Sequence, residues 1–280
     1  MKLLILLIAL GVQRYLNVNF SLASFDWFTP YQKMVKKLVP AKLMQGYVGV
    51  LILVLPIAVI VALVGAILNA TWLTGLIFGS VVMFYCLDGR DLGNQLGIAD
   101  GQEKIADARA REVLEESIPR DPAAKARAVS SGIFAYSLYH VFSVMFWYLI
   151  FGVFGAVTYV LIQHIASASK KEGSDLAKLS DNASTLQAGF DWLPVRLFGA
   201  SLAAVGSSAN VIKQLSKNLV GGFTDQGELA TVFGLAAIKA NPEKAENATV
   251  KEDKDALNLV FMSTGVWLAV VLVFTVIALV

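Results

Sequence analysis

Residues Gly132 to His164 read GIFAYSLYHVFSVMFWYLIFGVFGAVTYVLIQH, a stretch that holds no acidic residue and no Lys or Arg. One helix crosses the apolar core of a bilayer with about 20 residues, so two complete crossings need about 40. The stretch falls between these lengths. It therefore predicts either one long tilted helix or a helical hairpin that enters the membrane and returns. Gly152 and Gly155 lie near its middle, where a turn or a close helix contact suits glycine.

The composition of the whole chain is that of a membrane protein. Its 280 residues are 56% hydrophobic and 16% charged, with a mean hydropathy of +0.64, whereas a soluble domain is about 25% charged. A net charge of +2 is too small to indicate a nucleic-acid partner. A single cysteine, Cys86, excludes an intramolecular disulfide.

Three other stretches are apolar enough for the membrane: 46–68, 73–87 and 257–280. We therefore predict an all-α polytopic membrane protein with about three to five membrane segments, one of them possibly the re-entrant hairpin. We expect a single membrane domain over 1–280, a soluble helical segment over 88–131, and a second soluble or membrane-surface segment over 167–254.

A short aromatic and basic segment follows the N-terminal apolar run. Its members are the aromatic residues Phe25, Trp27, Phe28 and Tyr31 and the lysines Lys33, Lys36, Lys37 and Lys42. Aromatic rings favour the headgroup level and lysines the cytoplasmic side of a membrane. The segment predicts a membrane-surface helix, and a docking site for an anionic lipid or a partner is the alternative.

Motifs that carry chemistry are scarce. His140 and His164 are 24 positions apart, without cysteines or carboxylates at metal-ligand spacing. Neither a P-loop nor a G-x-S-x-G element is present. Asp88, Arg90 and Asp91 crowd one predicted helix end, which suits an ion-paired cap or, alternatively, a metal or phosphate site. The residues alone therefore predict no catalytic residue, no metal site and no cofactor.

Two patterns resemble a known family. Residues 190–197 read FDWLPVRL, which resembles the D-W-x-P-V-R-L signature of the AmpE family. A second pattern, F-W-x4-G-x2-G-A-x2-Y, matches at Phe146, Trp147, Gly152, Gly155, Ala156 and Tyr159. The resemblance implies a multi-pass protein of the bacterial inner membrane that acts in signalling for β-lactamase induction and cell-wall recycling.

The same motifs mark a wider superfamily that includes the CbiB/CobD membrane synthases of cobalamin assembly. Arg120-Asp121, residues 194–197 and Ala108-Arg109 resemble its conserved elements. The synthases carry a polar cluster, E-x3-E-N-x2-D, before the F-W pattern, and its positions are here Ser131, Ala135, Tyr136 and Tyr139. An acidic pair before the second motif becomes Gln187 and Ala188, and a nearby Asn becomes Asp191. Carboxylates hold metals and transfer protons at neutral pH, whereas Tyr does neither well. The comparison implies that the scaffold is kept without the synthase chemistry.

From this resemblance we predict a non-enzymatic regulator with a vestigial pocket formed by Arg120, Asp121, Asp191 and Arg196. Its ligand would be a small anionic molecule, since arginine favours paired anion contacts. Alternatively, the pocket would bind a protein partner. The lipid bilayer is the other expected partner of the chain. Three alternatives stay open. Arg196 could instead pair with Asp191 and pin its segment to the bilayer. Asp88, Asp91, Asp175 or Asp181 could converge beside Arg196 in an active CbiB-type synthase. A transporter subunit is the least favoured.

The resemblance also bears on topology. One shared site requires the segments 88–131 and 167–254 to face the same side, which favours a hairpin that turns near Gly152 and Gly155 and places both in the cytoplasm. A single span would instead place 167–254 in the periplasm.

Overall fold

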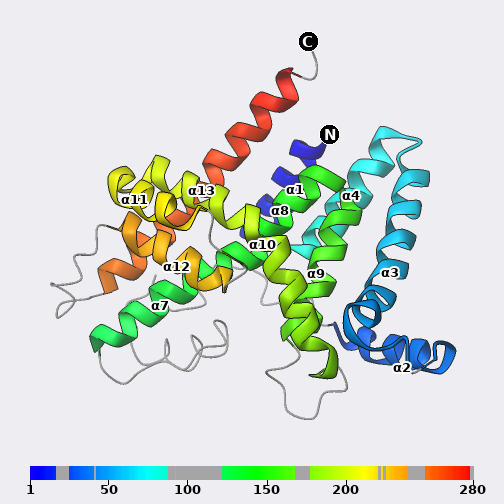
Figure 1. The fold of residues 1–280 in the computed structure, drawn as a ribbon. Coiled ribbons are helices and arrows are strands. Elements are labelled where there is room, and N and C mark those ends of the chain that lie inside the picture. The colour runs from blue at the N-terminus through cyan, green and yellow to red at the C-terminus, as the bar shows by residue number, and fades with distance from the viewer. Residues whose placement is uncertain are drawn as a thin grey trace. The chain divides into compact units, whose positions relative to one another are not determined.

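The chain is seen here as a computed structural model that describes residues 1–16, 25–40, 42–87, 92, 122–167, 177–219, 222, 225–238 and 250–277 (Figure 1). The described residues are 91% helical and contain no strand, which confirms the predicted all-α fold class. The chain divides into two compact units. Unit 1 comprises Met1–Gly89 and Ser143–Asp191, and unit 2 comprises Arg90–Phe142 and Trp192–Val280.

Three helices in the described part of the chain are long and apolar enough to cross a membrane: Gly46–Leu68, Arg127–Phe151 and Asp253–Ile277. The first matches the predicted span, and the third contains most of the stretch predicted over 257–280. The predicted span over 73–87 corresponds to a shorter apolar helix, Trp72–Cys86. The division into one membrane domain with soluble segments over 88–131 and 167–254 stays a prediction.

Unit 1 contains a pair of apolar helices that the sequence predicts. Helix α3 (Gly46–Leu68) and helix α4 (Trp72–Cys86) are joined by a short turn, where the Thr71 hydroxyl accepts a hydrogen bond from the Thr74 N–H at 3.4 Å. Thr71 is thus the N-cap of α4. The other elements of the unit are α1 (Lys2–Leu16), η1 (Phe25–Trp27), α2 (Phe28–Leu38), α8 (Ser143–Phe151), α9 (Val153–Ser167) and α10 (Ala177–Val205) up to Asp191.

Helix α1 packs along α4, where glycine makes room for it. A Cβ on Gly79 would lie 2.6 Å from the end of the Ile5 side chain. Further along, the Gln13 amide donates to the carbonyls of Phe84, at 3.0 Å, and Leu87. The N-terminal apolar run therefore forms a packed helix of unit 1.

The central apolar stretch reverses direction at Gly152. Helix α8 ends at Phe151, α9 begins at Val153, and Gly152 between them has φ +64°, a left-handed conformation that glycine adopts without steric cost. The two helices lie side by side (Figure 1), with the Gly155 backbone against the carbonyl of Trp147. The predicted hairpin is confirmed, with its turn at the predicted place; the membrane side of its flanks stays a prediction.

Unit 2 surrounds a second apolar core. Its elements are α7 (Pro122–Ser137), the π-helical turn η2 (Leu138–Phe142), α10 from Trp192 onward, α11 (Ser208–Asn218), α12 (Gln226–Ala237) and α13 (Val250–Ile277). Phe134, Phe142, Phe198 and Phe233 are fully buried in this core. Phe142 and Phe198 lie 4.4 Å apart between ring centroids.

Helix α10 belongs to unit 1 up to Asp191 and to unit 2 from Trp192 onward. It begins at Ala177 and continues without interruption to Val205. Pro194 lies inside it, as membrane-protein helices tolerate when neighbouring helices support them. Val195, Phe198 and Leu202 bury one side of its second half in the core of unit 2.

Candidate functional site

Asp191 lies at the centre of a buried cluster of hydroxyl groups in unit 1. Its carboxylate oxygen Oδ1 accepts a hydrogen bond from the Ser143 hydroxyl at 2.5 Å and one from the Tyr159 hydroxyl at 2.8 Å. Ser143 opens α8, Tyr159 lies in the middle of α9, and Asp191 lies in α10. Ser143, Tyr159 and Asp191 all have no exposed surface. One carboxylate oxygen therefore ties together three helices.

The second oxygen of this carboxylate, Oδ2, is buried and makes no hydrogen bond of normal geometry to any residue that the structure describes. Burial raises the pKa of Asp191 to about 7, because a charged carboxylate loses its hydration there; the hydrogen bonds from Ser143 and Tyr159, and the nearby Gln187 side chain, act in the opposite direction. Near neutral pH the group is thus poised between its two protonation states. When protonated, its Oδ2 can donate a hydrogen bond, and when charged it attracts a donor or a cation.

The raised pKa of Asp191 predicts how stability depends on pH. Between the ordinary pKa of 3.8 and about 7 the folded protein holds a proton that the unfolded chain has lost, so stability falls as pH rises through this window and levels off above it. Each pKa unit corresponds to about 1.4 kcal/mol, and we expect Asp191→Asn to remove roughly 2 kcal/mol of the decline between pH 5 and pH 7. The measurement is thermal unfolding in detergent at both pH values. An unchanged slope in the variant would contradict the assignment.

The motifs that suggested the family pack against each other around this cluster. The Trp147 indole donates to the carbonyl oxygen of Phe190 at 3.3 Å, and the two rings lie 4.7 Å apart. Tyr159, the last residue of the F-W pattern, bonds Asp191 of the second pattern. Gly152 makes the turn that brings α8 and α9 together. The residues of the two patterns that belong to unit 1 therefore form one packed, hydrogen-bonded cluster.

Arg196 is engaged by backbone carbonyls within unit 2. Its guanidinium donates to the carbonyl oxygens of Trp192 at 2.5 Å, Asn218 at 3.0 Å and Leu219 at 3.1 Å. It also lies 4.0 Å from the centroid of the Trp192 ring. Asn218 and Leu219 form the C-terminal end of α11, where the carbonyls lack helix partners and favour a cation. This geometry supports a structural role, in which Arg196 joins α10 to the end of α11.

Replacing Arg196 by Lys keeps the charge but loses the planar fork that reaches several carbonyls at once. Hydrogen bonds from charged groups contribute about 1.5–3 kcal/mol each, and we expect a loss of about 2 kcal/mol in unfolding free energy with lower membrane abundance. Arg127→Lys, on an exposed position of α7 in the same unit, is the matched control and should change nothing. Membrane abundance and thermal stability in detergent are the measurements. Equal stability of both variants would refute the structural role.

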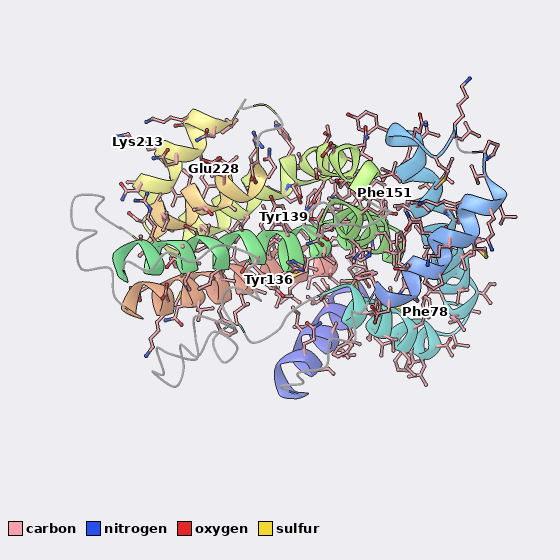
Figure 2. All side chains as sticks on the ribbon, turned by 90° about the horizontal axis from the view of Figure 1, so that it is seen from below. Phe78, Tyr136, Tyr139, Phe151, Lys213 and Glu228 are labelled. Carbon is pink, nitrogen blue, oxygen red and sulfur yellow. The ribbon has the colours of Figure 1, made fainter. Side chains whose placement is uncertain are left out.

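Two positions of the synthases' polar cluster hold tyrosines here, Tyr136 at the Asn and Tyr139 at the Asp, and both make packing or hydrogen-bond contacts in unit 2. The Tyr139 hydroxyl accepts a hydrogen bond from the Gly227 N–H at 2.7 Å and donates to Asp225 Oδ1 at 3.2 Å (Figure 2). Asp225 is itself the N-cap of α12, so Tyr139 completes the cap. The Tyr136 ring stacks on His140 with centroids 4.2 Å apart. The π-helical turn 138–142 presents Tyr139 and His140 together.

The four predicted ligand-binding residues are not all visible as one site. Arg120 and Asp121 lie outside the described residues, as do Asp88, Asp91 and Asp175 of the synthase alternative. Asp191 belongs to unit 1 and Arg196 to unit 2, and Asp181 is exposed on α10. The shared pocket therefore stays a prediction. Among the described residues, no three His, Cys, Asp or Glu side chains gather as metal ligands.

Sequence reasoning did not assign Ser143 a role, and it used Tyr159 only as part of a motif. A signal for Tyr159 existed, because a tyrosine in an apolar helix needs a hydrogen-bond partner. Nothing in the sequence paired it with Asp191, 32 positions later.

The fold and the cluster define a class of protein. It is an α-helical membrane protein in which serine and tyrosine hydroxyls bond a buried carboxylate, at the place where the two sequence patterns pack together. The family follows from sequence comparison. The chain belongs to the AmpE family, because the sequence model described as "Regulatory signalling modulator protein AmpE" matches residues 1–280. No curated protein and no solved structure gives a significant match. Family membership supports a regulatory role in signalling.

Proposed function

We propose that this chain is a non-enzymatic regulatory protein of the bacterial inner membrane that modulates β-lactamase induction in connection with cell-wall recycling. The observation that carries the proposal is the match of the AmpE family over residues 1–280. The three apolar helices of spanning length support a multi-pass arrangement in the membrane.

The tyrosines at two positions of the synthases' polar cluster support the non-enzymatic part of the proposal. Tyr139 is held at the N-terminus of α12 by Gly227 and Asp225, and Tyr136 is 8% exposed and stacked on His140. Tyrosines in these contacts stabilise the fold of unit 2. They would be poor substitutes for carboxylates that bind a metal or transfer a proton at neutral pH.

Asp191 is the best supported member of the proposed pocket of Arg120, Asp121, Asp191 and Arg196. Its Oδ2 makes no hydrogen bond of normal geometry within the described part of the chain, and a protonated carboxyl can donate this oxygen's hydrogen to an anionic ligand, whereas a charged one repels such a ligand. A pKa of about 7 makes both states accessible. Regulation would then depend on what Asp191 binds and on its protonation, without a covalent step.

Deletion of the gene followed by complementation with the full chain tests the function. We expect the response of β-lactamase synthesis to a β-lactam to change on deletion and to return with the full-length chain. An unaltered response after deletion would refute the proposal. The same plasmid should not support cobalamin-dependent growth of cells that lack the membrane synthase; growth there would establish the CbiB-type enzyme instead.

A further inference from the structure

Helix α2 presents lysines on one flank and apolar side chains on the other. Its buried line is Phe28, Gln32 and Val35. At about 100° per residue, Lys36, Lys33 and Lys37 fall within an arc of roughly 100° on one side of that line, and all three are exposed. The sequence of α2 contains no acidic residue, and Lys42 follows on the exposed connection to α3.

The opposite flank of α2 is apolar and uncovered. Met34 is 53% exposed and Leu38 is 75% exposed. A helix with a basic side, an apolar side and one line of anchoring residues has the composition of a helix that lies in a membrane interface. The lysine stems can cover apolar surface while their ammonium groups reach the polar region.

Contacts to three helices hold α2 and the preceding turn η1 at one end of unit 1. The Tyr31 hydroxyl donates to the Leu53 carbonyl of α3 at 3.1 Å. The Trp27 indole donates to the Tyr85 hydroxyl, near the end of α4, at 2.7 Å. Figure 1 shows α2 running across the end of α3 where that helix begins.

The third contact is with α9, through His164 in its last turn. The His164 ring stacks on Phe25 at 4.3 Å and meets Phe28 edge-on at 5.2 Å, both between centroids. The beginning of α3, the end of α4 and the end of α9 therefore meet at α2. Since α3 is the most apolar of the helices long enough to span a membrane in the described part of the chain, its two ends would lie at the two membrane surfaces, and α2 would lie at one of them.

From this placement we propose that the lysine face of α2, formed by Lys33, Lys36, Lys37 and Lys42, binds the phosphate headgroups of anionic phospholipids in the surrounding bilayer. Each basic residue close to an anionic membrane surface strengthens binding by roughly fivefold. The apolar flank with Met34 and Leu38 contacts the adjoining acyl chains, so the occupant is a lipid and not a soluble anion.

The test measures phospholipid binding to the full-length chain in detergent. Native mass spectrometry detects the bound lipid, with phosphatidylglycerol and phosphatidylcholine tested separately. We expect the unsubstituted chain to prefer phosphatidylglycerol, and Lys33→Gln combined with Lys37→Gln to lower that affinity roughly 25-fold, about fivefold for each lysine. The matched control is Lys213→Gln with Lys217→Gln, a pair with the same four-residue spacing on exposed positions of α11 (Figure 2). This control should retain the affinity, as should Lys33→Arg with Lys37→Arg.

Three results would overturn the proposal. One is equal phosphatidylglycerol affinity for the α2 glutamine variant and the unsubstituted chain. Another is an equal loss in the α11 control, which would reveal a general effect of net charge. The third is displacement of phosphatidylglycerol by inorganic phosphate, which would mean that a soluble anion is the ligand. Thermal stability of each variant is measured alongside, and we expect no change because the four substituted side chains are exposed.

Discussion

Gly155→Ala is expected to destabilise the protein by about 3 kcal/mol and to lower its membrane abundance sharply. A Cβ at this position would lie 2.9 Å from the carbonyl carbon of Trp147 and from Phe151 Cβ, and closer still to the Trp147 carbonyl oxygen. Backbone atoms cannot move aside as a flexible side chain can, so α8 and α9 would have to separate. Forced overpacking of this kind costs about 1–3 kcal/mol and occasionally more.

The measurement is the fraction of folded protein that remains after heating in detergent. Gly265→Ala is the control: it is a helical glycine in α13 with no atom within 4 Å of the added Cβ, and alanine there should be neutral or slightly stabilising. Gly152→Ala separates the two effects of glycine, because its added Cβ meets nothing within 4 Å but its φ is +64°, which costs about 1–2 kcal/mol. If Gly155→Ala were as stable as Gly265→Ala, the hairpin packing would be wrong.

Gly234→Ala is expected to have a comparable effect in unit 2. The added Cβ would overlap the ring of Phe134, which is fully buried. Phe134 lies in α7 and Gly234 in α12, so the glycine sets how closely these helices approach. We expect a loss of about 2–3 kcal/mol, measured by the same heating assay with Gly265→Ala as control. A simultaneous Phe134→Leu substitution should recover part of the loss by making room; no recovery would argue that the two residues do not meet.

The sequence predicted those features that depend on local pattern. The apolar run over 46–68 predicts α3 because its length and composition leave no other fold in a bilayer. The hairpin was one of two predicted arrangements, because 33 residues without an acid, Lys or Arg exceed one crossing and fall short of two, and glycines near the middle suit a turn. Helix α10 was harder to predict over 177–185, since polar residues surround the apolar Leu179 and Ala183, and only the structure shows that both are buried in unit 1.

The candidate site was predictable in part. Asp191 was identified through the motif. A carboxylate within an apolar segment can also be recognised from the neighbouring residues alone. Its partners Ser143 and Tyr159 are 48 and 32 positions away, and only the packing of three helices brings them together. The role of Arg196 needed the C-terminal carbonyls of α11, which no sequence pattern places beside it.

We propose that the buried carboxylate of Asp191 carries the regulatory function, and Asp191→Asn tests this proposal most directly. Asparagine has nearly the same shape as aspartate but cannot ionise. The control, Asp181→Asn, makes the same change at an exposed position of the same helix. The measurement is β-lactamase induction in cells that lack the native gene, with both variants at equal membrane abundance. We predict that Asp181→Asn restores the response and Asp191→Asn does not. Full restoration by Asp191→Asn would contradict the account.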